Sequence, residues 1–217
     1  MNWLNETFAG FDSNIFSLMH QFAEAAGGFL TPVMKLISLL GEKGIIFFLA
    51  GIILMLFSKT RKLGVCIFGA VACGAIITNL ILKDAIARIR PFEASETFKA
   101  FWEFVGSPKE DDFCFPSGHV TAIMAAATSL FIFCSKKWSY VGFFGVLLMA
   151  FARVYLIVHY ATDVLAGMIV GAIAGIIAWL ITKLIFKLLN NYNHKKFCDF
   201  CINFDVRNLF KKKQVKS

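Results

Sequence analysis

Long apolar runs, separated by short polar segments, dominate the hydrophobic pattern of this chain. A helix that spans a bilayer needs about 20 consecutive apolar residues. The first run is shorter than that, but turns at its ends would complete it, with Lys43 and Lys59 reaching the interfaces. The last run repeats a glycine at every fourth residue, which permits close helix packing. We therefore predict five membrane-spanning helices, at approximately 44–58, 63–82, 118–134, 138–158 and 162–189.

The segment 14–40 has a different, amphipathic pattern. Apolar side chains such as Ile15 and Phe22 recur at helical spacing, while polar residues interrupt the first part of the segment. Gly27 and Gly28 divide the segment into two parts. We expect two helices that lie in the membrane interface. A single tilted span is the alternative.

Composition agrees with an integral membrane protein. Of the 217 residues, 58% are hydrophobic and 17% are charged, whereas a soluble domain is usually about one quarter charged. A net charge of +8 could indicate a nucleic-acid partner, but the basic residues lie mainly in short loops and in the C-terminal tail. That distribution fits membrane topology and contact with anionic lipids. We therefore expect membrane lipids, and no nucleic acid, as partners.

The charges of the loops predict the orientation of the chain. Basic residues predominate in segments 58–62, 135–138 and 183–217, which share one side if all five runs span the membrane. The segment 83–116, on the opposite side, carries more acidic than basic residues. The positive-inside rule then places the tail in the cytoplasm and 83–116 at the outer face of the cell membrane.

Together these patterns predict an all-α, polytopic membrane helix bundle with five to six transmembrane helices and N-terminal amphipathic helices. We divide the chain into N-terminal helices at 1–43, a membrane core at 44–189 and a basic tail at 190–217. Prolines interrupt the polar stretch 84–116, which we expect to form a loop with a short surface helix. A helix at the cytoplasmic interface and a disordered segment are equally consistent with the tail.

Three polar clusters occur at the ends of the apolar runs. Charged groups are costly in a membrane, so they are usually kept for function. In chain order the clusters end the second run, open the third, and connect the fourth to the fifth, so all of them lie at the face that carries the loop 84–116. An accidental set would be scattered over both faces. The clusters are Lys83 with Arg90-Pro91, Pro116-Ser117-Gly118-His119, and Arg153 with His159 and Asp163.

The cations of these clusters, Lys83, Arg90 and Arg153, suit a bound anion. Lys83 and Arg90 are separated by two helical turns, so they share a face if the helix continues that far. Arginine adds planar, bidentate donors that match a phosphate. For Lys83 and Arg90 alone, anchoring at the membrane edge is the simpler alternative.

The second cluster opens a helix, where unpaired backbone N–H groups and the helix dipole favour an anion. Ser117 and Gly118 let the backbone approach that anion closely, as in other phosphate sites. Ser117 alone would be an ordinary N-cap residue. A cap, however, does not require the neighbouring imidazole of His119.

His159 and Asp163 are four residues apart, so on a helix, or on the turn that enters one, the carboxylate can reach one imidazole nitrogen. That contact would fix the tautomer and leave the other nitrogen free as a nucleophile. The alternative is a buried ion pair between Arg153 and Asp163 that holds two helices together.

A zinc site formed by His119, His159 and Asp163 is the main competing interpretation. The nearby cations would repel a metal ion, so we predict a metal-free site without a cofactor. The lone Cys198-x-x-Cys201 pair is a weak metal or redox signal, because neither a second pair nor a suitably spaced histidine accompanies it.

In order and spacing, the three clusters resemble the three-part signature of the type-2 phosphatidic acid phosphatase superfamily. The resemblance covers about residues 44–185. One departure is Ala152, where the family often has Ser, and we expect this change to remove a hydroxyl contact to the phosphate.

The resemblance implies a role for each residue of the signature. His159 would be the nucleophile that forms a phosphohistidine, and Asp163 would orient it. His119 would protonate the leaving group and later activate water. The phosphate-binding residues would be Lys83, Arg90, Ser117, Gly118 and Arg153.

The implied function is that of an integral membrane lipid phosphatase, with a lipid phosphate as substrate. The predicted outer-face site favours undecaprenyl diphosphate. Phosphatidylglycerophosphate, phosphatidic acid and transfer of phosphate to another lipid are alternatives, and the oligomeric state stays open. An ion-coupled transporter could use similar residues, but its site would usually lie near the midplane between repeated halves. A haloperoxidase that holds vanadate fits the membrane character less well.

Overall fold

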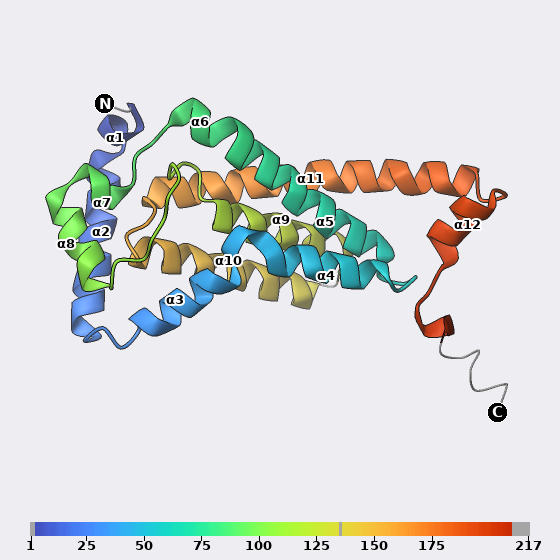
Figure 1. The fold of residues 1–217 in the computed structure, drawn as a ribbon, viewed down its shortest axis with the longest axis horizontal. Coiled ribbons are helices and arrows are strands. Elements are labelled where there is room, and N and C mark those ends of the chain that lie inside the picture. Colours follow the sequence, from blue (N-terminus) through green and yellow to red (C-terminus); the bar gives the residue numbers. More distant parts are fainter. Residues whose placement is uncertain (1–2, 135, 210–217) are drawn as a thin grey trace.

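The computed structural model describes residues 3–134 and 136–209, and within these ranges it contains helices and no strand. Figure 1 shows an elongated bundle with shorter helices at both ends. The bundle helices are α3 (Thr31–Leu40), α4 (Ile45–Met55), α5 (Arg61–Ala75), α9 (Gly118–Phe133), α10 (Lys136–Tyr155) and α11 (Ala161–Asn191). The end helices are α1 (Trp3–Thr7), α2 (Ala9–Ala25), α7 (Pro91–Ala94), α8 (Glu96–Phe104) and α12 (Lys196–Asn203). The 3-10 helix η1 (Glu42–Gly44) precedes α4, and the π-helix η2 (Ile76–Leu82) joins α5 to α6 (Lys83–Ile86).

Helix α9 lies in the middle of the bundle, where it packs against α5, α10 and α11. Small buried residues such as Cys66 and Ala125 line the contact between α5 and α9. Gly171 of α11 allows a still closer approach, because a Cβ atom there would lie 2.5 Å from the carbonyl oxygen of Thr121. The close packing predicted from the glycine repeat is confirmed, and it fixes the start of α11 against the start of α9.

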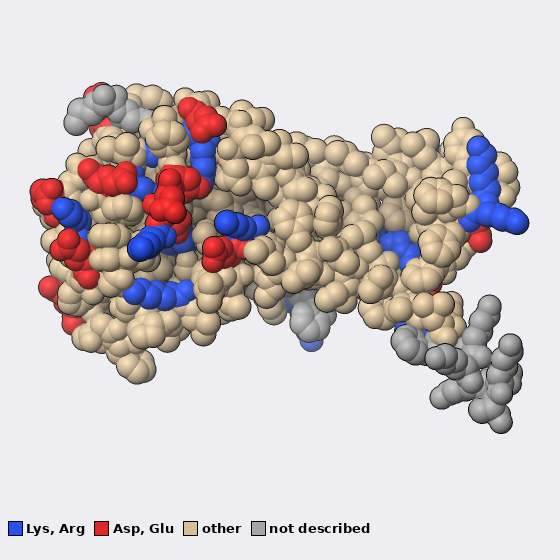
Figure 2. All heavy atoms as spheres, viewed as in Figure 1, with Lys and Arg blue, Asp and Glu red and all other residues tan. Residues whose placement is uncertain are grey.

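A broad apolar surface surrounds the middle of the bundle. In Figure 2, charged side chains gather toward the two ends, and the surface between them is largely without charge. Exposed apolar side chains such as Ile53, Phe68 and Leu180 belong to the bundle helices. Among the described residues, three helices are long and apolar enough to cross a membrane: Thr31–Met55, Arg61–Ala94 and Ala161–Asn191. The shorter apolar helices Gly118–Phe133 and Ser139–Tyr155 complete the bundle, and the predicted all-α membrane fold is confirmed.

The N-terminal region differs from the prediction in one respect. Helices α2 and α3 are separate and break at the Gly-Gly pair, as the pattern predicted. Helix α3, however, runs on into α4 and forms the first half of the candidate span Thr31–Met55 (Figure 1). Lys43 (φ +50°) and Gly44 (φ +67°) offset the two halves without reversing the chain. Residue 43, where we divided the chain, lies within this candidate span, and each half alone is too short to cross a bilayer.

The described part of the C-terminal tail is helical and packs against the turn between α4 and α5. The guanidinium of Arg61 donates to the carbonyl oxygens of Cys201 (3.1 Å) and Ile202 (2.7 Å) near the end of α12. The backbone N–H of Ser58 donates to the carboxylate of Asp205 at 3.0 Å. Of the two expectations for the tail, a helix is observed, while 210–217 lie outside the described residues.

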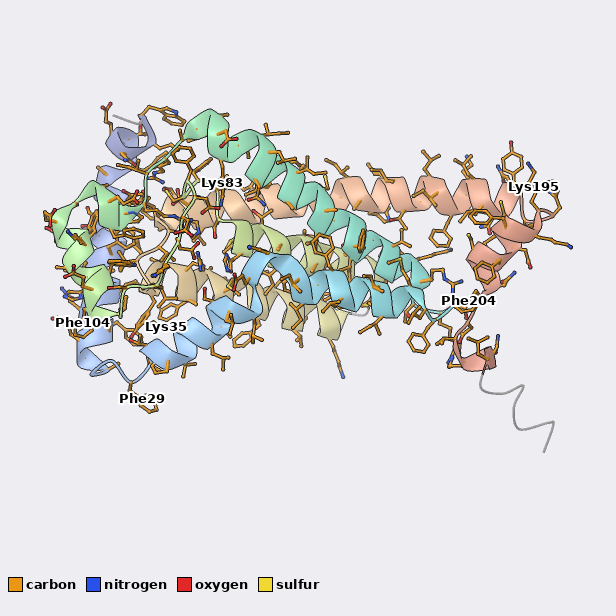
Figure 3. The ribbon with its side chains drawn as sticks, in the orientation of Figure 1. Phe29, Lys35, Lys83, Phe104, Lys195 and Phe204 are labelled. Atoms are coloured by element: carbon orange, nitrogen blue, oxygen red, sulfur yellow. The ribbon has the colours of Figure 1, made fainter. Side chains whose placement is uncertain are left out.

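Different segments of the chain cover the two ends of the bundle. Figure 3 shows Lys195 and Phe204 at the end that carries the tail and the α4–α5 turn. Lys83 and Phe104 lie toward the opposite end, where α2, α7 and α8 cover the bundle. The polar clusters of the signature belong to this second end.

Candidate active site

A cavity of about 680 Å³ whose lining includes several charged residues lies where η2, α9 and the end of α10 meet α3 and the loop after α8. Most of the predicted site residues line it. Ser117 and Asp163 are fully buried and sit next to lining residues. The predicted residues in the cavity wall are Lys83, Arg90, Gly118, His119, Arg153 and His159.

The start of α9 faces this cavity with an unusual cap. Ser117 occupies the N-cap position in an extended conformation, but its side chain makes no capping hydrogen bond. Its hydroxyl is buried without a hydrogen-bond partner among the described residues. A Cβ atom on Gly118 would meet nothing closer than Asn79 Oδ1 at 3.8 Å, so the protein itself leaves space there. The helix start thus offers an unused hydroxyl and an accessible backbone.

The helix that carries Lys83 ends early. The π-helix η2 precedes Lys83, and π-helical turns are frequent at functional sites. Helix α6 stops at Ala87, whose φ is +49°, and Arg90 is in an extended conformation before Pro91. The condition for Lys83 and Arg90 to share one helix face is therefore not met. The extended segment brings them together instead, since both bind the carboxylate of Asp112.

His159 lies in the turn between α10 and α11. Its Nε2 is 3.3 Å from a guanidinium nitrogen of Arg90, and its Nδ1 is 3.7 Å from Asp163 Oδ2. The distance from Nδ1 to Asp163 Oδ2 is longer than a hydrogen bond, so the carboxylate lies close to the imidazole without the expected hydrogen bond. Burial, together with the charges of Arg90 and Arg153, lowers the pKa of His159 well below its usual value. Burial and these charges thus favour the neutral imidazole, whose Nε2 lies beside Arg90.

Carboxylates from the loop after α8 neutralise the cations of the cavity. Asp112 pairs with Lys83 and Arg90, while Glu110 pairs with Arg90 (3.3 Å) and Arg153. Burial alone would raise the pKa of Asp112, but the hydrogen bond and charge of Lys83, with those of Arg90, lower it. Sequence reasoning counted these acids only as loop charge and missed their contacts.

Arg153 is held from an unexpected direction. One of its guanidinium nitrogens donates to Ser38 Oγ at 2.6 Å, so α3 contributes to the site. Ala152, the departure from the family pattern, is fully buried in an apolar cluster with Tyr155 and Leu156. Its side chain therefore packs in the core.

The structure does not bring His119, His159 and Asp163 together as metal ligands. Among the described residues, no group of three or more His, Cys, Asp or Glu side chains could hold a metal ion. Cys198 and Cys201 belong to α12, at the far end of the bundle. Cys114 lies near the site, but its buried thiol donates to the carbonyl oxygen of Ile89, and burial raises its pKa.

Sequence reasoning also missed Arg88 and Asp12. Arg88 and Arg90 are both buried, whereas Ile89 between them is 44% exposed, as expected for alternation along extended backbone. Arg88 pairs with Asp163 and with Asp12 of α2. The signal was available, because a residue before proline favours an extended conformation, which puts both arginines on one side.

These features match a known family. A family model described as the PAP2 superfamily matches residues 63–187, which is more than half of the chain. The protein belongs to the PAP2 superfamily, and the resemblance drawn from the three clusters is confirmed.

The chain is also similar to two known proteins. It is 31% identical over 116 residues to an undecaprenyl-diphosphatase of Sulfolobus acidocaldarius, and the match covers 53% of each chain. The chain thus spans about half the length of the curated relative it matches. A transmembrane PAP2 type phosphatidylglycerolphosphate phosphatase from Bacillus subtilis aligns with a TM-score of 0.56 and 23% identity, over 82% of this chain and 96% of that chain. This second likeness establishes the shared fold.

Proposed function

We propose that this protein is a lipid phosphatase that releases phosphate from a lipid diphosphate through a phosphohistidine at His159. The observation that carries the proposal is the position of His159 Nε2, 3.3 Å from Arg90, in a cavity that Lys83 and Arg153 also line. Phosphoryl transfer depends mostly on positioning and on neutralising charge. A neutral imidazole beside these cations meets both needs.

In the first step the lone pair on His159 Nε2 attacks phosphorus, and the bond from phosphorus to the leaving oxygen breaks. Lys83, Arg90 and Arg153 hold the non-bridging oxygens. The imidazole gains positive charge as the P–N bond forms, and Asp163, 3.7 Å from Nδ1, stabilises that charge. The unpaired hydroxyl of Ser117 is free to donate to the same phosphate.

His119 handles the protons of both steps. It lines the same cavity as His159, and in its protonated form it donates a proton to the leaving oxygen and becomes neutral. In the second step it accepts a proton from the water that attacks phosphorus. The P–N bond then breaks, inorganic phosphate leaves, and His159 returns to its neutral form.

Substrate binding exchanges one set of anions for another. Glu110 and Asp112 neutralise the cations before substrate arrives. A phosphate takes over these contacts, and the carboxylates move out with their loop. Their side chains are 19% and 54% exposed, so water can solvate them once they leave the cations.

Undecaprenyl diphosphate is the substrate we propose. The relative with 31% identity bears the name undecaprenyl-diphosphatase. We place the cavity at the outer face of the cell membrane and the tail in the cytoplasm, because basic residues predominate at the tail end. A reporter fused after Ser217 tests this orientation: cytoplasmic activity supports it, and periplasmic activity would refute it.

Phosphate release by the purified full-length protein in detergent tests the function. We expect release from undecaprenyl diphosphate to exceed release from phosphatidylglycerophosphate, phosphatidic acid and a soluble phosphomonoester. EDTA should have little effect. A preference for another lipid would correct the substrate, strong inhibition by EDTA would refute a metal-independent reaction, and no release from any of them would overturn the proposal.

A further inference from the structure

A buried ion cluster holds the side of Asp163 that faces away from His159. Asp163 Oδ1 accepts a hydrogen bond from Arg88 at 2.5 Å, whereas Oδ2 is the oxygen near the imidazole. Oδ2 also accepts from the backbone N–H of Tyr160 at 2.9 Å. Both oxygens are therefore fixed, one of them by a cation outside the three signature clusters.

The N-terminal helix α2 completes this cluster through Asp12. One oxygen of Asp12 accepts from Arg88 at 2.8 Å and from the hydroxyl of Thr162 at 2.7 Å. The other accepts from the backbone N–H of Thr162 at 3.0 Å. Because Thr162 precedes Asp163 in the chain, Asp12 holds both the arginine and the first turn of α11.

The charges of this cluster do not cancel. Arg88 supplies one positive charge and Asp12 and Asp163 supply two negative charges. The three side chains are at most 3% exposed, so water screens them little. If Arg88 paired with Asp163 alone, it would neutralise that carboxylate. Since Asp12 shares the guanidinium, a net negative charge remains beside His159.

We propose that Asp12 and Arg88 are positioning residues for the reaction at His159. They hold Asp163 in place and keep it negative, so that it stabilises the positive charge that the imidazole gains when Nε2 attacks phosphorus. This inference rests on the proposed function. Through Asp12, helix α2 would contribute to catalysis as well as covering this end of the bundle.

Two variants that touch the same arginine separate charge from packing. Asp12→Asn keeps the shape of the side chain and removes its charge. Asn5→Ala removes a neutral acceptor, 2.6 Å from Arg88 Nε, and leaves the charges unchanged. We expect Asp12→Asn to lower kcat by about 10- to 100-fold, as for partners that orient a functional histidine. Its KM should change little, because the phosphate-binding cations are untouched.

The kinetic outcome is decisive in either direction. Asn5→Ala should keep kcat close to that of wild type, because it leaves the charges of the cluster and the two hydrogen bonds to Asp163 in place. Wild-type kcat in Asp12→Asn would overturn the inference. So would an equal loss in both variants, which indicates packing alone. If Asp12→Asn does not fold, Asp12→Ser removes the same negative charge with a smaller polar side chain, and wild-type kcat in that variant would likewise refute the inference.

A spectroscopic measurement separates this inference from the proposed function. In the full chain with 15N-labelled histidine, the His159 resonances are assigned by their loss in His159→Gln. We expect Asp12→Asn to shift the Nδ1 resonance and Asn5→Ala to leave it in place. An unshifted resonance in Asp12→Asn would overturn the inference, even if the protein acts on another substrate. Conversely, a shift without phosphate release would count against the proposed function alone.

Discussion

Arg88 and Arg90 are two residues apart, and each binds two carboxylates, but the partners differ. The partners of Arg88, Asp12 and Asp163, lie on helices and are almost completely buried. Those of Arg90, Glu110 and Asp112, lie on a loop and are 19% and 54% exposed. A buried pair is costly to break, whereas an exposed pair contributes little. We infer that Arg88 keeps its partners during the reaction and that Arg90 exchanges them for phosphate.

The largest effect is expected when Arg90, whose ion pairs we infer to be exchangeable, is replaced. Arg90→Gln removes a charge that neighbours His159 and the proposed phosphate position, so we expect kcat/KM to fall by about a hundredfold to a thousandfold. Binding of inorganic phosphate, measured as competitive inhibition, should weaken as well. Asp12→Asn is the matched control, because it should lower kcat with little change in phosphate inhibition. Wild-type phosphate inhibition in Arg90→Gln would contradict the assignment of Arg90.

A smaller and opposite effect, tighter binding of inorganic phosphate, is expected when the carboxylates that pair with Arg90 are neutralised. The double variant Glu110→Gln, Asp112→Asn removes the anions that compete with phosphate for the cations. Each partly exposed pair is worth about 0.2–1 kcal/mol, so inorganic phosphate should inhibit at a concentration a few-fold lower. Asp111→Asn, which changes the carboxylate between them, should leave inhibition unchanged. Weaker inhibition in the double variant would indicate that the loop carboxylates assist phosphate binding.

The smallest effect on catalysis is expected in the bundle itself. Gly171→Ala places a Cβ atom 2.5 Å from the Thr121 carbonyl oxygen, so we expect a loss of about 1–3 kcal/mol in the free energy of unfolding. Activity per folded molecule should hardly change. Gly118→Ala is the counterpart: its Cβ has space within the protein, so stability should hold while phosphate binding weakens. Thermal unfolding and phosphate release, measured on both variants, separate packing from the site, and the reverse pattern would contradict the assignment of both glycines.

The sequence predicted the bundle and the grouping of the clusters for sound physical reasons. Apolar runs of membrane length report helices directly, and their order places Lys83, His119 and His159 at one end. The join between α3 and α4 was missed because the segment 31–40 is amphipathic when considered alone. The structure joins the two short helices across the offset at Lys43 and Gly44, and only together are they long enough to cross a membrane.

The hydrophobic pattern could not predict contacts between polar residues that are far apart in the chain. Asp12 is far from Arg88 in the chain, and nothing in the periodicity of α2 indicates that its carboxylate is buried beneath α11. Glu110 and Asp112 looked like surface charges of a loop, because sequence reports charge but not the partner that neutralises it. Nothing in the sequence likewise indicated that Ser38 of α3 would contact Arg153.

Trapping of the phosphorylated enzyme tests the central claim most directly. Wild-type protein is mixed with a lipid diphosphate that carries a radiolabelled terminal phosphate and is quenched within the first turnover. We predict a label on the protein that is stable in base, labile in acid, and absent from His159→Ala. Phosphate release by His159→Ala should fall on the order of 10⁴-fold or more, as for the loss of other nucleophiles. A label that persists in His159→Ala, or full activity in that variant, would contradict the account.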